Sequence, residues 1–106
     1  MQFAIIATDK PNSEQIRDRL RSRRLEWLTA NQKRIAATGG LVDDNNRHVN
    51  GGLMIVDAAN RAEVEKFAAE DPFTAAGLYQ KVEIIRWRKV YWEYGRITTH
   101  DPFTPD

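Results

Sequence analysis

The sequence contains no cysteine among its 106 residues, so disulfide bonds, thiolate metal sites and a cysteine nucleophile are excluded. It also lacks long apolar runs, and its longest ones fall far short of the roughly 20 residues that span a bilayer. No charged segment followed by an apolar stretch and a cleavage site opens the chain, so we predict no signal peptide. These absences together predict a cytoplasmic protein without a membrane partner.

The sequence also lacks an excess of charge of either sign. The 16 basic residues nearly balance the 15 acidic residues, which gives a formal net charge of +1. A dedicated nucleic-acid binder usually carries a clear basic excess, so the near balance argues against a nucleic-acid partner. The oxygen-rich segment Asp43-Asp44-Asn45-Asn46 lacks the spacing and the distal Glu of a calcium loop. No phosphate loop or nucleophilic triad occurs either, so we predict neither a metal nor a cofactor.

What remains is a chain of one-domain length with a hydrophobic share of 42%. The first half begins with an apolar, β-branched strand over residues 3–7. Helical periodicity then runs from residue 14 to about residue 37, after a capping-box spacing of Asn12 and Gln15, and we expect Gly39-Gly40 to stop this helix. Ile16, Leu20, Trp27, Leu28 and Ile35 form its apolar stripe, and the polar residues Arg24 and Asn31 lie inside that stripe.

The second half predicts a hairpin, a helix and a final strand. Short strands over residues 41–43 and 53–56 flank the turn residues 44–48. Asn60 caps a second helix with Val64, Phe67 and Ala68 on its inner face, and this helix ends near Glu70 because Pro72 disfavours helical geometry in the residue before it. One more helical turn over residues 73–76 ends at Gly77. A long strand region follows over residues 79–94, where we expect a bulge or an excursion beyond the sheet.

The element order β-α-β-β-α-β is that of a ferredoxin-like α+β fold, in which two helices cover one face of a four-stranded antiparallel sheet. We place this domain in residues 1–94 and a tail in residues 95–106. Apolar side chains occur on both faces of the predicted strands. A second copy packed on the face without helices is the simplest cover for them, so we predict a homodimer.

The chain resembles the YciI-like (YCII-related) family from residue 1 to about residue 92. The segments that carry the resemblance are the first strand with Asp9-Lys10-Pro11, residues 21–28, Gly51-Gly52, and residues 70–79 followed by Val82-Glu83-Ile84. The resemblance implies a dimeric α/β barrel with a pocket between helices and sheet in each subunit. The better understood members are small-molecule enzymes. One type removes chloride from a chlorinated hydroxymuconate, and muconolactone isomerases share the architecture.

The family's proposed catalytic pair is a His on the first helix and the Asp of an Asp-Pro-aromatic motif. Asp71 matches this Asp, but the His position falls at Arg24. Arginine stays protonated in proteins and cannot do ordinary acid–base work. Asp71 and Arg24 are therefore the catalytic candidates: Asp71 as base or orienting group, and Arg24 as a fork for a ligand carboxylate. A structural Arg24–Asp71 ion pair, or an Arg24 that reaches solvent, is the alternative.

Arg24, Asn31, His48 and Phe73 form the predicted ligand-binding set. Core hydrogen bonding for Asn31 and a solvated turn position for His48 are the alternatives. Asp71-Pro72-Phe73-Thr74 recurs as Asp101-Pro102-Phe103-Thr104 just after His100, either as turn chemistry or as a docking segment. Two functions follow: an enzyme or enzyme relative that acts on a small anionic carboxylate without a cofactor, by isomerase, lyase or lactone chemistry, or a non-catalytic dimeric ligand-binding or interaction module.

Overall fold

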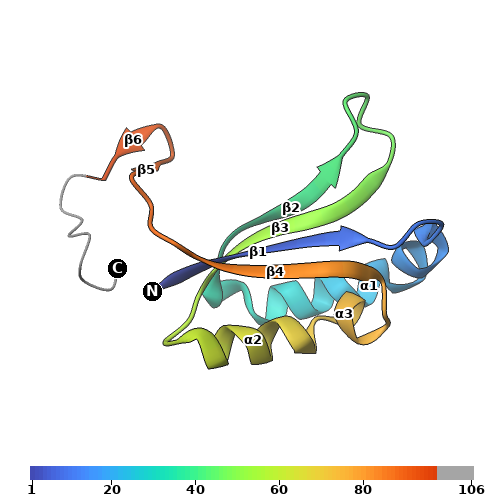
Figure 1. Ribbon diagram of the computed structural model, residues 1–106, viewed down its shortest axis with the longest axis horizontal. Helices are drawn as coiled ribbons and strands as arrows, with labels where there is room; N and C mark the ends of the chain where they lie inside the picture. The colour runs from blue at the N-terminus through green and yellow to red at the C-terminus, as the bar shows by residue number, and fades with distance from the viewer. Residues whose placement is uncertain (98–106) are drawn as a thin grey trace.

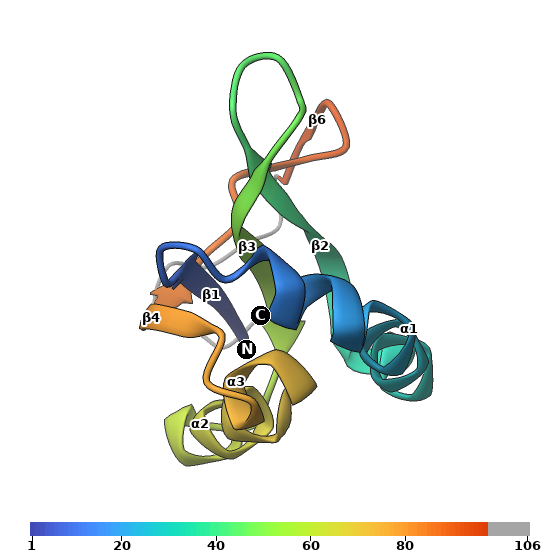
Figure 2. The same ribbon diagram turned by 90° about the vertical axis from the view of Figure 1, so that its right-hand side faces the viewer.

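The computed structural model describes residues 1–97, and both His100 and the second Asp-Pro-Phe-Thr segment lie outside the described residues. The main sheet has four antiparallel strands in the order β2-β3-β1-β4. The helices cover one face of this sheet, and the opposite face carries no helix (Figure 1, Figure 2). The predicted ferredoxin-like α+β fold is thereby confirmed. No helix in residues 1–97 has the length and apolar character needed to cross a membrane.

Residues 1–97 form ten elements. They are β1 (Gln2–Asp9), α1 (Glu14–Ala30), the 3₁₀ turn η1 (Gln32–Arg34), β2 (Ile35–Val42), β3 (Val49–Asp57), α2 (Arg61–Glu70), α3 (Pro72–Ala75), β4 (Tyr79–Trp87), β5 (Tyr91–Trp92) and β6 (Gly95–Arg96). The predicted β2–β3 hairpin and the helical turn before Gly77 are both present, and Gly77 has the positive φ of 75° that glycine adopts readily.

The first helix is shorter than its periodicity predicts, because α1 ends at Ala30 and not near residue 37. Ile35 belongs to β2, where it pairs with Val56, and the predicted strand over residues 41–43 begins as early as Ile35. Gly39 and Gly40 lie inside this strand and do not stop the helix. The helical spacing of Ile35 is coincidental, since pairing with β3 and a β-branched side chain favour the extended conformation there.

The start of α1 also differs from the predicted capping box. Asn12 has a φ of 57° and forms part of the turn, and Ser13 takes the cap position without a side-chain bond to the helix. The Ser13 hydroxyl instead donates to the carbonyl of Lys10 at 2.5 Å. Turn geometry at Asn12, a residue that tolerates left-handed backbone, explains why its side chain does not cap the helix.

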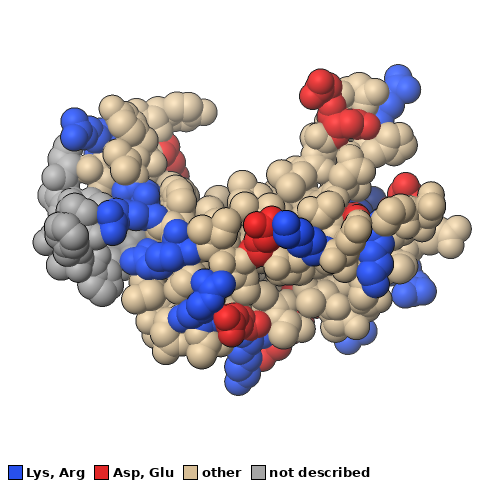
Figure 3. Space-filling view, viewed as in Figure 1, with Lys and Arg blue, Asp and Glu red and all other residues tan. Residues whose placement is uncertain are grey.

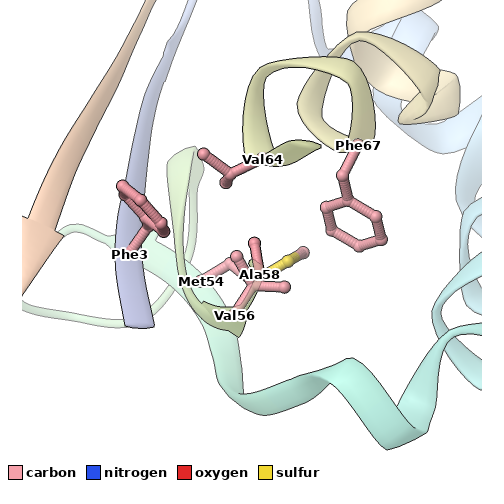
Figure 4. Packing of buried hydrophobic residues seen from close by; sticks show 6 residues of the cluster. All are labelled: Phe3, Met54, Val56, Ala58, Val64 and Phe67. Atoms are coloured by element: carbon pink, nitrogen blue, oxygen red, sulfur yellow. The ribbon is translucent and has the colours of Figure 1, made fainter. Parts of the chain in front are cut away.

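The core lies between the sheet and α2 (Figure 4). Its buried cluster consists of Phe3, Met54, Val56, Ala58, Val64 and Phe67. The predicted inner face of α2 is confirmed, because Val64, Phe67 and Ala68 are its buried residues. Asn60 caps the helix as predicted, accepting a 2.9 Å bond from the backbone N–H of Glu63.

The first helix contributes differently, since none of its residues is fully buried. Trp27 reaches the core by stacking on Phe67, with ring centroids 4.7 Å apart. A polar residue on the inner face of α1 can therefore lie close to the core and still reach solvent.

The final strand region leaves the sheet, as the sequence suggested. β4 ends at Trp87, and the chain then forms a separate two-stranded hairpin from β5 and β6. We call residues 88–97 the arm. It stands at the end of the sheet opposite the β2–β3 hairpin tip, and both rise on the side away from the helices (Figure 1).

Candidate functional site

Arg24 on α1 and Asp71 between α2 and α3 form a two-pronged ion pair. The Arg24 Nε lies 3.1 Å from Asp71 Oδ1, and the Arg24 Nη2 lies 3.0 Å from Asp71 Oδ2. The two side chains are only 17% and 8% exposed. Such a planar fork fixes the orientation of both groups, and removing either partner would leave the other charge poorly solvated.

The turn that follows α2 holds the Asp71 carboxylate in place. Asp71 is the C-cap residue of α2 and the N-cap residue of α3. Its Oδ1 accepts a 2.9 Å hydrogen bond from the backbone N–H of Phe73. Pro72 occupies the first position of α3, where a missing N–H costs nothing. Helix termination and carboxylate placement are therefore two results of one Asp-Pro-Phe sequence.

Phe73 lies under two guanidinium groups from the same helix. The Cζ of Arg24 is 4.7 Å and the Cζ of Arg17 is 4.8 Å from the ring centroid. Arg17 also makes a two-pronged pair with Asp9, with bonds of 2.9 and 2.8 Å. Burial by itself lowers the pKa of Arg17, but the bonds and charge of Asp9 outweigh it and raise the pKa above its usual value.

Tyr79 completes this cluster at the start of β4. Its ring meets Phe73 edge to face, with centroids 6.2 Å apart. Burial, together with the nearby charge of Asp71, raises the pKa of Tyr79 to about 12. The phenol is therefore a neutral hydrogen-bond donor at physiological pH.

A pocket opens beside the ion pair, between the helices and the sheet. Its lining residues are Ile5, Ala7, Arg24, Trp27, Gly52, Leu53, Met54, Phe67, Ala68, Asp71, Thr74, Tyr79 and Val82. The enclosed part measures about 20 Å³, and the empty space is about 340 Å³ when the part open to solvent is counted. The enclosed part has room for about one water molecule. A larger ligand would extend towards solvent past Val82, which pairs with Ala7 on this face of the sheet and is exposed.

The polar groups at this pocket are mostly donors. Within residues 1–97, no hydrogen bond engages the Nη1 of Arg24 or the hydroxyl of Tyr79. These groups suit a ligand oxygen that carries negative charge. No group of three or more His, Cys, Asp or Glu side chains in the described part of the chain could hold a metal ion.

The structure brings three of the predicted site residues together: Asp71, Arg24 and Phe73. It does not bring Asn31 or His48 to the pocket. Asn31 is the C-cap residue of α1, and its Nδ2 donates to the carbonyl of Trp27 at 2.8 Å. His48 is exposed in the β2–β3 turn, where its backbone N–H donates to Asp43. Local backbone bonding thus accounts for both positions.

Sequence reasoning missed Asp9, Arg17 and Tyr79. Arg17 precedes Arg24 by seven residues, which is about two helical turns, so both point from one face of α1. Asp9 is the last residue of β1, and Tyr79 is the first residue of β4. Side-chain chemistry at the ends of adjacent strands was the available signal, since β1 pairs with β4 and Asp9 lies opposite Tyr79.

Comparisons with known proteins agree with this architecture. A solved structure of 5-chloro-2-hydroxyhydroquinone dehydrochlorinase from Burkholderia phenoliruptrix AC1100, in complex with 2,5-dihydroxybenzoquinone, matches with a TM-score of 0.77 and 29% sequence identity, over 83% of this chain and 94% of that one. An uncharacterized protein of Haemophilus influenzae is 30% identical over 98 residues, which cover 86% of this chain and all of the relative. The YCII-related domain family matches residues 1–88. The chain therefore belongs to the YCII-related domain family.

Proposed function

We propose that the pocket beside Arg24 and Asp71 binds a small, unsaturated or cyclic compound that carries an anionic oxygen, and that the protein acts on it by elimination, isomerisation or lactone chemistry without a cofactor. The carrying observation is the buried Arg24–Asp71 pair at the pocket wall. The dehydrochlorinase with its bound dihydroxybenzoquinone supports a planar, oxygen-rich ring as the ligand.

Each group has a proposed role. The Nη1 of Arg24 and the hydroxyl of Tyr79 donate to ligand oxygens and stabilise negative charge that develops there. Asp71 acts as the base or as the group that orients Arg24. Val82 and Trp27, which line the pocket, offer apolar surface to the ring.

A second candidate is a non-catalytic ligand-binding module. The observation that favours it is the engagement of Asp71, whose two oxygens already accept bonds from Arg24 and from the backbone of Phe73. Both oxygens are therefore held by donors of the protein itself and not by a substrate. Arg24 cannot replace Asp71 as a base, because a guanidinium does not give up its proton at physiological pH.

We also propose that the protein is a homodimer. Ala4, Ile55 and Ile85 lie side by side across three strands. They alternate with the residues that pack on the core and therefore lie on the face without helices. Ala4 and Ile55 are buried, but Ile85 is 49% exposed, and Leu53, two residues before Ile55 and so on the same face, is 40% exposed. Large apolar side chains exposed on one sheet face are typical of a protein–protein contact surface.

A thermal-shift titration with 2,5-dihydroxybenzoquinone, muconolactone and simple carboxylates tests the binding site. We expect a ring compound to raise the apparent stability of the wild type, because it binds only the folded state. Tyr79→Phe should weaken this shift, and Arg21→Ala on the exposed face of α1 should not. The proposal is wrong if no compound shifts the wild type at millimolar concentration.

Turnover separates the two candidates. Chloride release from chlorinated hydroxyquinones and lactone isomerisation should be measured with the wild type and with Asp71→Asn. An enzyme loses turnover in Asp71→Asn and keeps ligand binding in part. A binding module shows a thermal shift with the wild type and no turnover with any compound.

A further inference from the structure

The arm lies almost wholly outside the part of the chain that the family matches, which ends at residue 88. Its attachment to the sheet is specific. Trp92 on β5 packs against Trp87 at the end of β4, with ring centroids 6.1 Å apart. The backbone N–H of Ile97 donates to the carbonyl of Val90 at 2.7 Å, which closes the hairpin at its base. These two contacts fix the arm as a projection at the end of β4.

The tip of the arm presents aromatic side chains to solvent at a conformational cost. Glu93 and Tyr94 have φ values of 49° and 68°. Two consecutive left-handed residues give the hairpin turn that normally uses Asn-Gly, and non-glycine residues are strained there by about 1–2 kcal/mol each. Tyr94 is fully exposed and Tyr91 is 63% exposed. Exposed tyrosines on a strained projection are typical of a contact surface.

Opposite charges gather at the two ends of the sheet. The β2–β3 hairpin tip, residues 43–48, contains two Asp and one Arg, whereas the arm contains Arg88, Lys89 and Arg96 against a single Glu93. Figure 3 shows the surface hollowed between these two projections, with acidic side chains on the hairpin tip and basic ones towards the arm. A second copy seated in this hollow would contact both the arm and the hairpin tip.

Charge selects one orientation of that second copy. If hairpin tip faced hairpin tip and arm faced arm, like charges would meet at both ends. Turning the second copy end over end brings the acidic hairpin tip of each copy to the basic arm of the other, which is favourable at both ends. A two-fold axis that runs across the strands produces this arrangement, and it is self-complementary as a symmetric dimer requires.

We propose that the arm is a clasp that grips the β2–β3 hairpin tip of a second copy, so that arm and hairpin alternate around the dimer. The proposal rests on the homodimer proposed above. It adds which segments meet: Tyr91 and Tyr94 supply the apolar contact, and the basic arm residues meet the acidic hairpin tip. The ligand pocket is not part of this contact.

Cross-linking tests the arrangement directly, because the native chain has no cysteine. Sedimentation first establishes whether the wild type is dimeric. Asn45→Cys at the hairpin tip and Glu93→Cys at the arm tip, which leaves both tyrosines in place, are then mixed and treated with a short bis-maleimide. We expect covalent dimers in the mixture and few in either variant alone. Leu25→Cys on α1, exposed by 58%, should not cross-link with either.

A second measurement guards against a cross-linker artefact. Tyr91→Ser with Tyr94→Ser should raise the dimer dissociation constant about tenfold or more, whereas Leu25→Ser should not change it. A dimer that forms without arm-to-hairpin cross-links, or that keeps its affinity in the tyrosine variant, overturns the clasp but leaves the homodimer standing. A monomeric wild type overturns both. Neither result bears on ligand binding, which the thermal-shift titration measures separately.

Discussion

Arg24 and Asp71 lie 47 residues apart in the chain, and the Nε and Nη2 of the guanidinium meet the two oxygens of the carboxylate. The pair joins the middle of α1 to the junction of α2 and α3. Since α1 contributes no fully buried residue, the ion pair and the stacking of Trp27 on Phe67 are specific links between this helix and the rest of the fold. Site geometry and helix docking therefore depend on the same contact.

The first prediction concerns this link. Arg24→Ala leaves the Asp71 carboxylate buried without its counter-charge, so we expect a loss of about 3 kcal/mol in the free energy of unfolding. Urea denaturation measures it. Arg21→Ala is the matched control, because Arg21 pairs with Asp18 at the surface and such pairs contribute about 0.5 kcal/mol or less.

A double substitution shows whether the loss comes from the pair itself. Asp71→Ala should cost less in the Arg24→Ala background than in the wild type, because the buried charge is already unpaired there. Equal costs in the two backgrounds would mean that the ion pair contributes no coupling energy.

The second prediction concerns the N-terminus of α2. Asn60→Ala removes the oxygen that accepts from the N–H of Glu63, so we expect a loss of about 1 kcal/mol. Asn60→Asp keeps an acceptor at this position and should change stability little. If the Ala and Asp variants denature at the same urea concentration, the cap is not what Asn60 provides.

The third prediction concerns two glycines of the hairpin. A Cβ at Gly51 would clash with the carbonyl oxygen of Ala7 on β1, whereas a Cβ at Gly39 would meet no atom within 4 Å. Gly51→Ala should therefore lower the free energy of unfolding by at least about 1–3 kcal/mol, because backbone must move. Gly39→Ala should stay within about 1 kcal/mol of the wild type when both are compared at one protein concentration.

The order of elements could be predicted from sequence because local signals agreed with the global fold. Asn60 marked a helix start, Pro72 marked its end, and Val64 and Phe67 marked its inner face. The end of α1 could not be predicted in the same way. Ile35 continues the helical spacing of the apolar stripe, and only its pairing with Val56 shows that it belongs to a strand. Local periodicity does not report pairing with a strand that comes later in the chain.

The residues of the candidate site likewise include some that the sequence could predict and some that it could not. Arg24 and Asp71 could be predicted as partners because a charged residue inside an apolar stripe needs a counter-charge. Arg17 and Asp9 were missed because Asp9 reads from sequence as an ordinary loop residue after the strand predicted over residues 3–7, whereas it is the last residue of β1. Their relation to the site depends on Phe73, which lies within 5 Å of both guanidinium groups. Contacts through a shared aromatic ring leave no spacing pattern in a sequence.

The last prediction concerns pH. The pKa of Tyr79 is about 12 in the folded protein, against about 10 for an unfolded tyrosine. Below about pH 10 both states keep the proton, so the stabilising effect of the neutral phenol is fully present. Between about pH 10 and 12 the unfolded state loses the proton first, so stability falls as pH rises.

Tyr79→Phe has no proton to lose and should show a shallower fall over this range. Paired urea denaturations of the two proteins across that window measure the difference, and near-ultraviolet absorbance should show one phenolate step near pH 12 that Tyr79→Phe lacks. Identical pH profiles for the two proteins would mean that the Tyr79 hydroxyl is as well solvated as a free phenol, and would contradict its burial beside Asp71.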